Sequence, residues 1–274
     1  PVAVHAVTIE AAGVLPDGAL GIDAGLTLTK VVRATGATLS MSAYETRALG
    51  EITAASGPAG VTGARAGQIT VAGATPSQEI DAAARGVIAL MRASGRVIDG
   101  DFLLTLLGTG TAFAAVRDGV AQHLGGTPMG GGSFAGIARR IDPSLTYGAM
   151  IAAAARGNRR NVDLMVSDAY PDGIGRIGPD LTAAHLAKGG DASIDDVLAG
   201  LLNLHGENIG QIAAGRAVVA KLSRVVLAGG FAHDNDALVA SIAGMTRMFG
   251  LQTECAPWPG FAGALGAALI AAGA

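Results

Sequence analysis

The sequence predicts an α/β protein of two lobes with a cleft between them, and three observations support this fold class. The chain has 274 residues, more than one domain usually needs. Half of the residues are apolar but only 4% are aromatic, so the core must be built from closely packed small aliphatic side chains. Strand-like segments repeatedly run into glycine turns and then into segments of helical spacing. We place the boundary between an N-terminal lobe, residues 1–105, and a C-terminal lobe, residues 106–274.

Composition excludes several classes of protein. The net charge is −3 and the basic residues are scattered, which argues against a nucleic-acid surface. The apolar segment 260–274 is shorter than the roughly 18 residues that cross a bilayer, and the N-terminus has no charged region before an apolar run. The single cysteine, Cys255, excludes an internal disulfide and a thiolate-bound metal cluster. We therefore expect a cytoplasmic protein that binds neither nucleic acid nor membrane.

Residues 19–32 are the segment around which we expect the chain to be organised, and we expect them to form a strand, a tight turn and an antiparallel return strand. Gly21 and Gly25 give the backbone freedom there, Asp23 lies at the turn and Lys30 follows it. Exposed N–H groups beside a carboxylate and a lysine suit nucleotide phosphates, with the carboxylate holding a metal ion. The alternative is an ordinary hairpin with one polar turn.

The rest of the first lobe carries one further candidate for chemistry. We expect an extra strand or an irregular arm in residues 1–18, a third strand and then a helix in 33–57, and a strand in 61–71 that ends in a glycine turn. Residues 79–94 have apolar side chains at helical spacing. Glu79 and Asp81 in the first turn of this helix either only favour the helix dipole or take part in a reaction.

The second lobe begins with an apolar strand, residues 101–107, that runs into Gly108, Thr109, Gly110 and Thr111, a turn of the kind that accepts phosphate oxygens. A return strand at 112–116 and a segment at 120–124 lead to the glycine cluster 125–133, which opens a helix at 134–141. Consecutive glycines before a helix let a nucleotide place its phosphates on free N–H groups. A flexible linker is the alternative.

The remaining segments repeat this order of elements. We expect helices at 147–155, 162–170, 181–188, 193–219 and 235–249, strands at 224–227 and 252–255, and a closing helix after 257–260. The strand at 224–227 runs into Gly229 and Gly230. The polar side chains between residues 203 and 211 are either solvated or joined in an internal network.

Eight motifs, in order, resemble those of the type II pantothenate kinases, members of the actin, hexokinase and chaperone-ATPase superfamily. They span almost the whole chain after Gly18: GIDAGLTLTK (21–30), EIDAAARG (79–86), LGTGTAF (107–113), GGTPMGGGSFAG (125–136), GNRRNVDLMVSDAY (157–170), GPDLTAAH (178–185), NIGQIA (208–213) and GFAGALGA (260–267). The resemblance implies a two-lobed actin-like ATPase (ribonuclease H-like) fold with a nucleotide cleft between the lobes. ATPase activators of radical dehydratases are related, but they need cluster cysteines that this chain lacks.

The resemblance also implies an activity: ATP-dependent phosphorylation of pantothenate in coenzyme A biosynthesis, with Mg²⁺. Asp23 and Lys30 would serve the ATP phosphates and the metal, and Glu79 would be the general base. The family is dimeric through the long helices of its second half, which here implies a homodimer formed by 162–170 and 193–219. The implied nucleotide-binding residues are Gly25, Leu26, Thr27, Gly108, Thr109, Gly110, Thr111, Gly130, Gly131 and Gly132, with Gly229 and Gly230 near the adenine.

Two positions depart from the family pattern. Leu26 stands where the phosphate turn normally has a second glycine, and His123 stands where an arginine usually precedes the glycine segment and helps to hold the substrate. Histidine cannot reproduce a permanently charged, bidentate guanidinium. The alternatives are therefore a kinase of another small hydroxyl compound and a catalytically weak nucleotide-binding homologue, or else a substitution at His123 without functional consequence.

Overall fold

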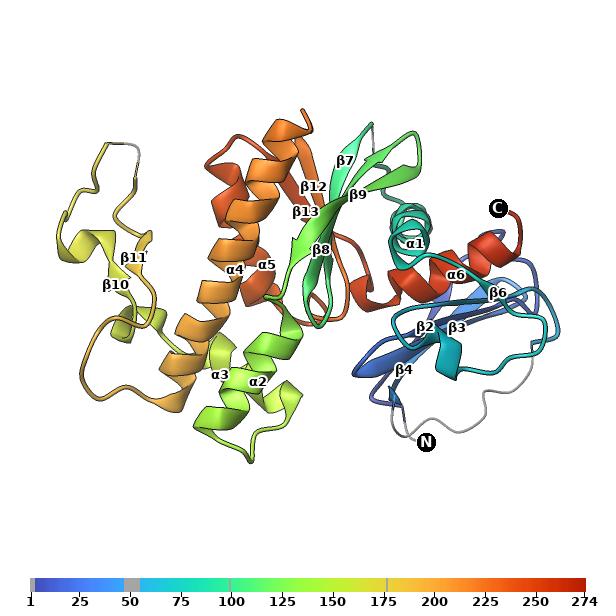
Figure 1. Cartoon of the computed structure of the whole chain (residues 1–274), viewed down its shortest axis with the longest axis horizontal. Coiled ribbons are helices and arrows are strands. Elements are labelled where there is room, and N and C mark those ends of the chain that lie inside the picture. Colours follow the sequence, from blue (N-terminus) through green and yellow to red (C-terminus); the bar gives the residue numbers. More distant parts are fainter. Residues whose placement is uncertain (1–2, 47–54, 99, 176) are drawn as a thin grey trace.

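The computed structural model describes residues 3–46, 55–98, 100–175 and 177–274, and it contains two β-sheets in two lobes (Figure 1). Within these residues the first sheet has the strand order β1-β4-β3-β2-β5-β6 and the second has the order β13-β12-β7-β8-β9. Each sheet carries glycine turns at the strand ends that face the other lobe. The predicted two-lobed α/β fold is confirmed.

The first sheet is organised around β2, whose five residues are all buried. β2 pairs antiparallel with β3, in the predicted hairpin, and parallel with β5. The extra strand predicted near the N-terminus is the edge strand β1. The strands are β1 (His5–Glu10), β2 (Leu20–Ala24), β3 (Leu28–Thr35), β4 (Thr38–Glu45), β5 (Ala59–Thr62) and β6 (Thr75–Pro76), and the short helix η2 (Ala66–Gln68) follows β5.

The second sheet is mixed. Its central strands β7 and β12 are parallel, β13 adds to β12 in parallel, and β8 and β9 continue the other edge as antiparallel hairpins. The strands are β7 (Phe102–Leu107), β8 (Thr111–Arg117), β9 (Val120–Thr127), β12 (Arg224–Ala228) and β13 (Gln252–Cys255). The helices of this lobe are α2 (Gly131–Ile141), α3 (Tyr147–Arg156), α4 (Ile194–Val219) and α5 (Asp236–Arg247).

Two helices lie between the sheets, α1 (Glu79–Ala93) and α6 (Ala262–Ala271), and α6 follows the short helix η5 (Pro259–Phe261) (Figure 1). One hydrophobic core joins them to both sheets, because Val32 of β3, Leu90 of α1, Leu265 of α6 and Val226 of β12 belong to it. The last helix of the chain therefore packs against the first lobe. The predicted division near residue 105 stays a prediction.

α6 approaches its neighbours more closely than side chains would allow. A Cβ atom built on any of four glycines would collide with a backbone carbonyl of the facing element. At these four positions, the backbone of α6 is in direct contact with the backbone of β2, β5 or α1. The four glycines are Gly21 on β2, Gly60 on β5, Gly86 on α1 and Gly266 on α6.

Two predicted helices are wrong. The segment 162–170 instead follows the short helix η3 (Arg159–Asn161) and forms the strand β10 (Leu164–Met165) and the short helix η4 (Val166–Asp168). The segment 181–188 contains the strand β11 (Thr182–Ala184), which pairs with β10. The buried carboxylate of Asp163 accepts the N–H of Leu186 at 2.8 Å and pairs with Arg159 at 3.4 Å. The bond from Leu186, 23 residues further along the chain, holds the segment in an irregular form that local apolar spacing does not reveal.

The glycine cluster 125–133 also differs from its prediction. β9 continues to Thr127, and α2 begins at Gly131 rather than at Phe134, so most of the cluster is regular structure and not a linker. The strand predicted in residues 33–57 is β4, whereas most of the helix predicted after it would fall on residues 47–54, outside the described part of the chain. In the described ranges, no helix combines the length and apolarity that crossing a bilayer requires.

We expect Gly266→Ala to destabilise the protein by at least about 2 kcal/mol, because the new methyl group meets the carbonyl oxygen of Ala82 and neither backbone can yield freely. Chemical denaturation monitored by circular dichroism would measure the change. The matched control is Gly215→Ala, a helical glycine of α4 with open space around it, which should gain about 0.5 to 1 kcal/mol. An equal effect of the two substitutions would contradict this role for the α6 glycines.

Candidate active site

A cleft of about 1880 Å³ separates the lobes and is lined by residues of both. Most of the residues singled out in the sequence line it, which brings together segments that are 200 positions apart in the chain. From the first lobe these are Asp23, Gly25, Leu26, Thr27, Lys30 and Glu79, and from the second Gly108, Thr109, Gly110, Thr111, His123, Gly131, Gly132 and Gly230. Gly130 and Gly229 are not among the lining residues.

The turn between β2 and β3 carries a buried carboxylate beside a lysine. Asp23 is 9% exposed, and the ammonium of Lys30, its partner across the hairpin, donates to its Oδ2 at 3.2 Å. Within the described residues, the N–H groups of Leu26 and Thr27 have no hydrogen-bond partner. The turn therefore presents two amides and one cation to the cleft, which is the arrangement that anionic oxygens favour.

The side chain of Leu26 does not close this turn. It is 52% exposed, so it projects into the solvent of the cleft instead of packing on the turn backbone. Gly25, in contrast, has a structural reason to be glycine, because a Cβ there would lie 2.8 Å from the carbonyl oxygen of Leu28 and 3.3 Å from the Lys30 ammonium. The leucine at position 26, in place of the family's second glycine, leaves the N–H groups of Leu26 and Thr27 in place and changes only the surface of the cleft beside them.

Two glycines that the sequence reasoning did not identify enclose the Asp23 carboxylate. A Cβ at Gly63, where φ is +97°, would lie 2.6 Å from Oδ1, and a Cβ at Gly263 on α6 would lie 3.1 Å from Oδ2. Only hydrogen atoms fit beside the carboxylate, which keeps its oxygens accessible from the cleft. A carboxylate that lines the cleft is a hard oxygen ligand of the kind that Mg²⁺ prefers, so Asp23 fits that ion.

The second turn, Gly108 to Thr111, is joined to the start of α2 through backbone atoms. The N–H groups of Gly131 and Gly132 donate to the carbonyl oxygens of Gly108 and Thr109, both at 2.9 Å. The turn closes on itself through the N–H of Gly108 and the carbonyl of Gly110 at 2.8 Å. The N–H groups of Thr109 and Gly110 find no acceptor in the described part of the chain, so they remain available to a ligand.

These bonds correct the prediction made for the glycine cluster. The N–H groups of Gly130, Gly131 and Gly132 are not free, because the last two bond to the turn and Gly130 donates to Ser133 Oγ at 3.0 Å. The glycines are required for close approach: a Cβ at Gly130 would lie 2.7 Å from Gly110. The cluster therefore supports the phosphate turn, and the amides open to a ligand belong to Thr109 and Gly110.

Glu79 is the first residue of α1 and is exposed at the wall of the cleft. Its pKa is raised above the ordinary 4.5, first because the cleft walls remove solvent from the carboxylate and then because of the negative charge of Asp23, while Lys30 acts in the opposite direction. A carboxylate whose pKa is raised accepts a proton more readily, which is what a general base requires. Its sensitivity to Asp23 and Lys30 places it in the same electrostatic field as the phosphate turn.

Two further side chains, His123 and Arg139, line the cleft from the second lobe. His123 on β9 lies opposite Ala114, beside an irregularity in the β8–β9 pairing, and is exposed to the cleft. Arg139, on the face of α2 that also carries Ala135, lines the same cleft and makes no ion pair within the described residues. The sequence reasoning missed Arg139, although its spacing of four from Ala135 and eight from Gly131 marks one helix face.

The glycines after β12 have different roles. Gly230 lines the cleft and its N–H has no acceptor in the described residues. Gly229 has φ of +103°, donates its N–H to Pro259 at 2.8 Å, and could not carry a Cβ because the backbone of Leu107 is too close. Gly229 therefore allows two strand ends to meet, and Gly230 is the one available to a nucleotide.

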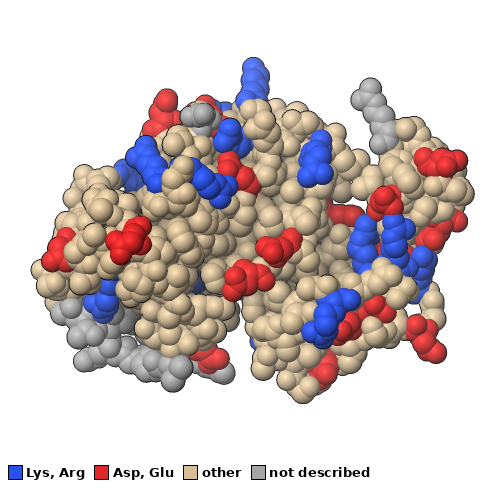
Figure 2. Space-filling model, turned by 180° about the vertical axis from the view of Figure 1, so that it is seen from behind, with Lys and Arg blue, Asp and Glu red and all other residues tan. Residues whose placement is uncertain are grey.

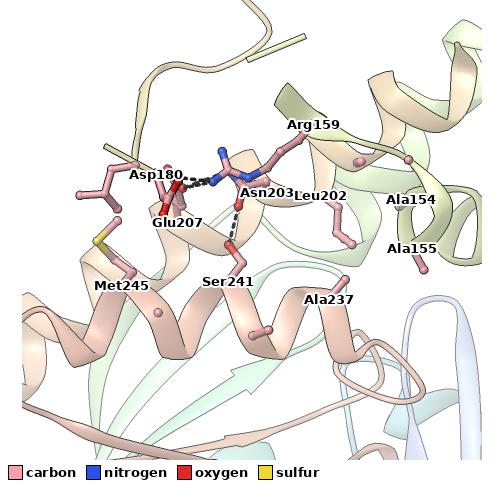
Figure 3. A pocket seen from close by; sticks show the side chains of 15 residues that line it. Ala154, Ala155, Arg159, Asp180, Leu202, Asn203, Glu207, Ala237, Ser241 and Met245 are labelled. Carbon is pink, nitrogen blue, oxygen red and sulfur yellow. Dashed lines mark hydrogen bonds and ion pairs between the residues drawn. The ribbon is translucent and has the colours of Figure 1, made fainter. Parts of the chain in front are cut away.

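A second cavity, of about 420 Å³, lies between α3, α4, α5 and the segment before α4 (Figure 3). Its polar side chains bind one another: Arg159 faces Glu207 at 4.0 Å and donates to the carbonyl of Asp180 at 2.8 Å, while Ser241 donates to Asn203 at 2.9 Å (Figure 3). The internal network left open from the sequence is thus present for Asn203 and Glu207 of α4. This cavity belongs to the packing of the second lobe.

On the face shown in Figure 2, acidic and basic side chains are interspersed and no broad surface of one sign is visible. A nucleic-acid surface would show a continuous basic area. Inside the cleft, Lys30 and Arg139 line the walls from opposite lobes.

Comparisons with known proteins agree with this geometry. The family model described as Fumble matches residues 101–270. The type II pantothenate kinase of Oceanobacillus iheyensis is 29% identical over 261 residues, which cover 91% of this chain and 98% of that protein. Among solved structures, the activator of the 2-hydroxyisocaproyl-CoA dehydratase from Clostridium difficile with bound ADPNP has a TM-score of 0.59 at 17% identity and covers 92% of this chain and 93% of its own. The ROK hexokinase from Thermus thermophilus has a TM-score of 0.53 at 13% identity and covers 96% and 98%.

The fold and the cleft define a class, the two-lobed actin-like α/β proteins. Within this class the chain belongs to the Fumble family, because the family model covers well over half of it. The resemblance to type II pantothenate kinases that the eight motifs indicate is confirmed.

Proposed function

We propose that the protein transfers the γ-phosphoryl group of ATP to a hydroxyl group of pantothenate, with Mg²⁺, in the cytoplasm, where ATP is available. The observation that carries the proposal is one cleft in which Glu79 shares the electrostatic field of Asp23 and Lys30 and the free amides of two turns are present. Relatives with this order of motifs, such as that of Oceanobacillus iheyensis, are type II pantothenate kinases.

In the proposed reaction, different residues would bind the phosphates and the metal ion. The amides of Leu26, Thr27, Thr109 and Gly110 and the ammonium of Lys30 would hold and neutralise the phosphate oxygens. Asp23 would hold Mg²⁺, which when bound supplies charge neutralisation at the phosphate oxygens.

Glu79 would take the proton from the acceptor hydroxyl as its oxygen attacks the γ-phosphorus. Phosphoryl transfer needs chiefly positioning and charge stabilisation, so this set of groups suffices.

The acceptor end of the cleft is where the chain departs from its family. Pantothenate is a carboxylate, and the missing arginine at position 123 removes a fixed positive charge. We infer that Arg139 supplies this charge from α2, because its guanidinium lines the cleft without a partner among the described residues. The second candidate function, phosphorylation of another small hydroxyl compound, is favoured only by His123.

We expect Glu79→Gln to lower kcat by about 10²-fold or more while nucleotide binding persists, because the amide keeps the size of the side chain but accepts no proton. The raised pKa of Glu79 predicts that kcat/KM of the wild type falls on the acid side at a pH above 4.5, and that this fall disappears in the variant. Steady-state kinetics across pH would measure both. Asp81→Asn, in the same helical turn and the same cleft, is the control and should retain turnover; unchanged turnover in Glu79→Gln would reject the role.

We expect Arg139→Gln to raise the KM for pantothenate by about tenfold, a loss of about 1.4 kcal/mol, and to leave the KM for ATP unchanged. Arg140→Gln is the matched control, since the neighbouring guanidinium donates to the carbonyl of Gly136 and does not line the cleft. As a second arm, His123→Arg should improve kcat/KM for pantothenate by about tenfold if the lost charge limits binding. Equal effects of the two arginine variants would remove Arg139 from the acceptor site, and a lower kcat/KM in His123→Arg would mark histidine as an adapted replacement.

We further propose a homodimer, formed by α4 and the segment before it. The helix predicted at 162–170 is absent, but this segment exposes a group of large apolar side chains: Leu164, Tyr170, Ile174, Ile177 and Leu186, followed by Ile194 at the start of α4. Neighbouring exposed apolar side chains of this number are typical of an interface between subunits.

Light scattering at micromolar concentration should give twice the mass of the chain, and the double variant Ile174→Asp, Ile177→Asp should give the monomer, because a buried interface does not tolerate unpaired carboxylates. The control is Val97→Asp, an apolar position between α1 and β7 that is 67% exposed, which should remain dimeric. A monomeric wild type would exclude this assembly.

A further inference from the structure

Three potential metal ligands meet across the mouth of the cleft and have no part in the proposed reaction. His5 lies on β1 of the first lobe, and His233 and Asp234 follow β12 of the second. One ligand atom from each of the three lies within 4.8 Å of the others. The two imidazole rings contact edge to face, with centroids 4.7 Å apart, although they come from different lobes.

The distances approach those of a metal shell. Ligand atoms about 2.0 to 2.2 Å from a tetrahedral ion lie roughly 3.3 to 3.6 Å from one another. His233 Nε2 and Asp234 Oδ2 are 3.5 Å apart already. His5 alone would have to move, by little more than an ångström, and its place on an exposed edge strand permits that shift.

The chemistry of the group selects the kind of ion. Two imidazole nitrogens and one carboxylate oxygen form a set that Zn²⁺ binds with a fourth position open to water, whereas Mg²⁺ prefers oxygen ligands. The ring of His233 is held in place, because it packs edge to face on Phe261.

We propose that His5, His233 and Asp234 form a Zn²⁺ site that ties the two lobes together at the mouth of the nucleotide cleft. The site is separate from Asp23, the residue suited to Mg²⁺. Kinases of two lobes open to release their nucleotide, and a metal ion ligated from both lobes opposes that opening. Bound Zn²⁺ therefore slows the dissociation of the nucleotide from this protein.

The direct test is calorimetric titration of the full chain with Zn²⁺ in the absence of nucleotide. The wild type should bind one ion per chain at this site. His5→Ala and Asp234→Asn should each weaken the affinity by at least about tenfold, since losing even an outer hydrogen-bond partner of a ligand costs about 10- to 100-fold. Asn suits position 234, where φ is +51°, because it adopts the left-handed conformation readily.

The matched control is Asp118→Asn, the same substitution at a residue with φ of +48° in the β8–β9 turn, which should bind Zn²⁺ as the wild type does. Absence of binding, or equal affinity in the wild type and His5→Ala, overturns the site. In a second measurement, dissociation of a fluorescent ATP analogue should slow when Zn²⁺ is added to the wild type and not when it is added to His5→Ala. An unchanged dissociation rate in the wild type overturns the bridging of the lobes. Zinc binding is measured without any acceptor, so its outcome is independent of the proposed kinase activity.

Discussion

The close contact of α6 with β2, β5 and α1 is the constraint on which the rest of the structure depends. Through Gly21, Gly60, Gly86 and Gly266, main chain meets main chain, and no side chain can adjust to take up an error in position. This contact sets α1, and therefore Glu79 at its first residue, relative to the strand that carries Asp23. It also brings Gly263 beside the Asp23 carboxylate. The position of Glu79 relative to the Asp23 hairpin is thus set by contacts between backbone atoms, which cannot adjust as side chains do.

Backbone contacts also fix the position of site residues in the second lobe. The turn that presents the amides of Thr109 and Gly110 is held by carbonyl groups bonded to the first residues of α2, and α2 carries Arg139 eight residues further on. A shift of the turn would therefore move the helix and its arginine with it. In the proposed reaction, the second lobe would hold both the nucleotide and the acceptor, while the first lobe would contribute Glu79 and Lys30.

The sequence predicted those parts of the fold that depend on local signals. The hairpin at Asp23 and the helix at Glu79 follow from turn glycines and helical apolar spacing, and both are present. The segment around Asp163 could not be predicted, because its shape depends on a buried carboxylate paired with Arg159 and bonded to Leu186. Arg139 was missed for a related reason. Sequence spacing shows which residues share a helix face, but not whether that face lines a cleft. The roles assigned to Gly130 to Gly132 needed correction since sequence shows a glycine but not whether its N–H is already bonded.

The hydrogen bonds between the backbone of the second turn and the first residues of α2 affect which positions of the cleft can change during evolution. Backbone hydrogen bonds and closely packed glycines hold the walls of the cleft in position. The side chains that project into the cleft can therefore change without moving those walls. Leu26 is half exposed and His123 lies on an exposed strand face, so neither supports those walls. Substitutions at such positions can therefore change the surface of the cleft one residue at a time, while the backbone that presents the free amides stays the same.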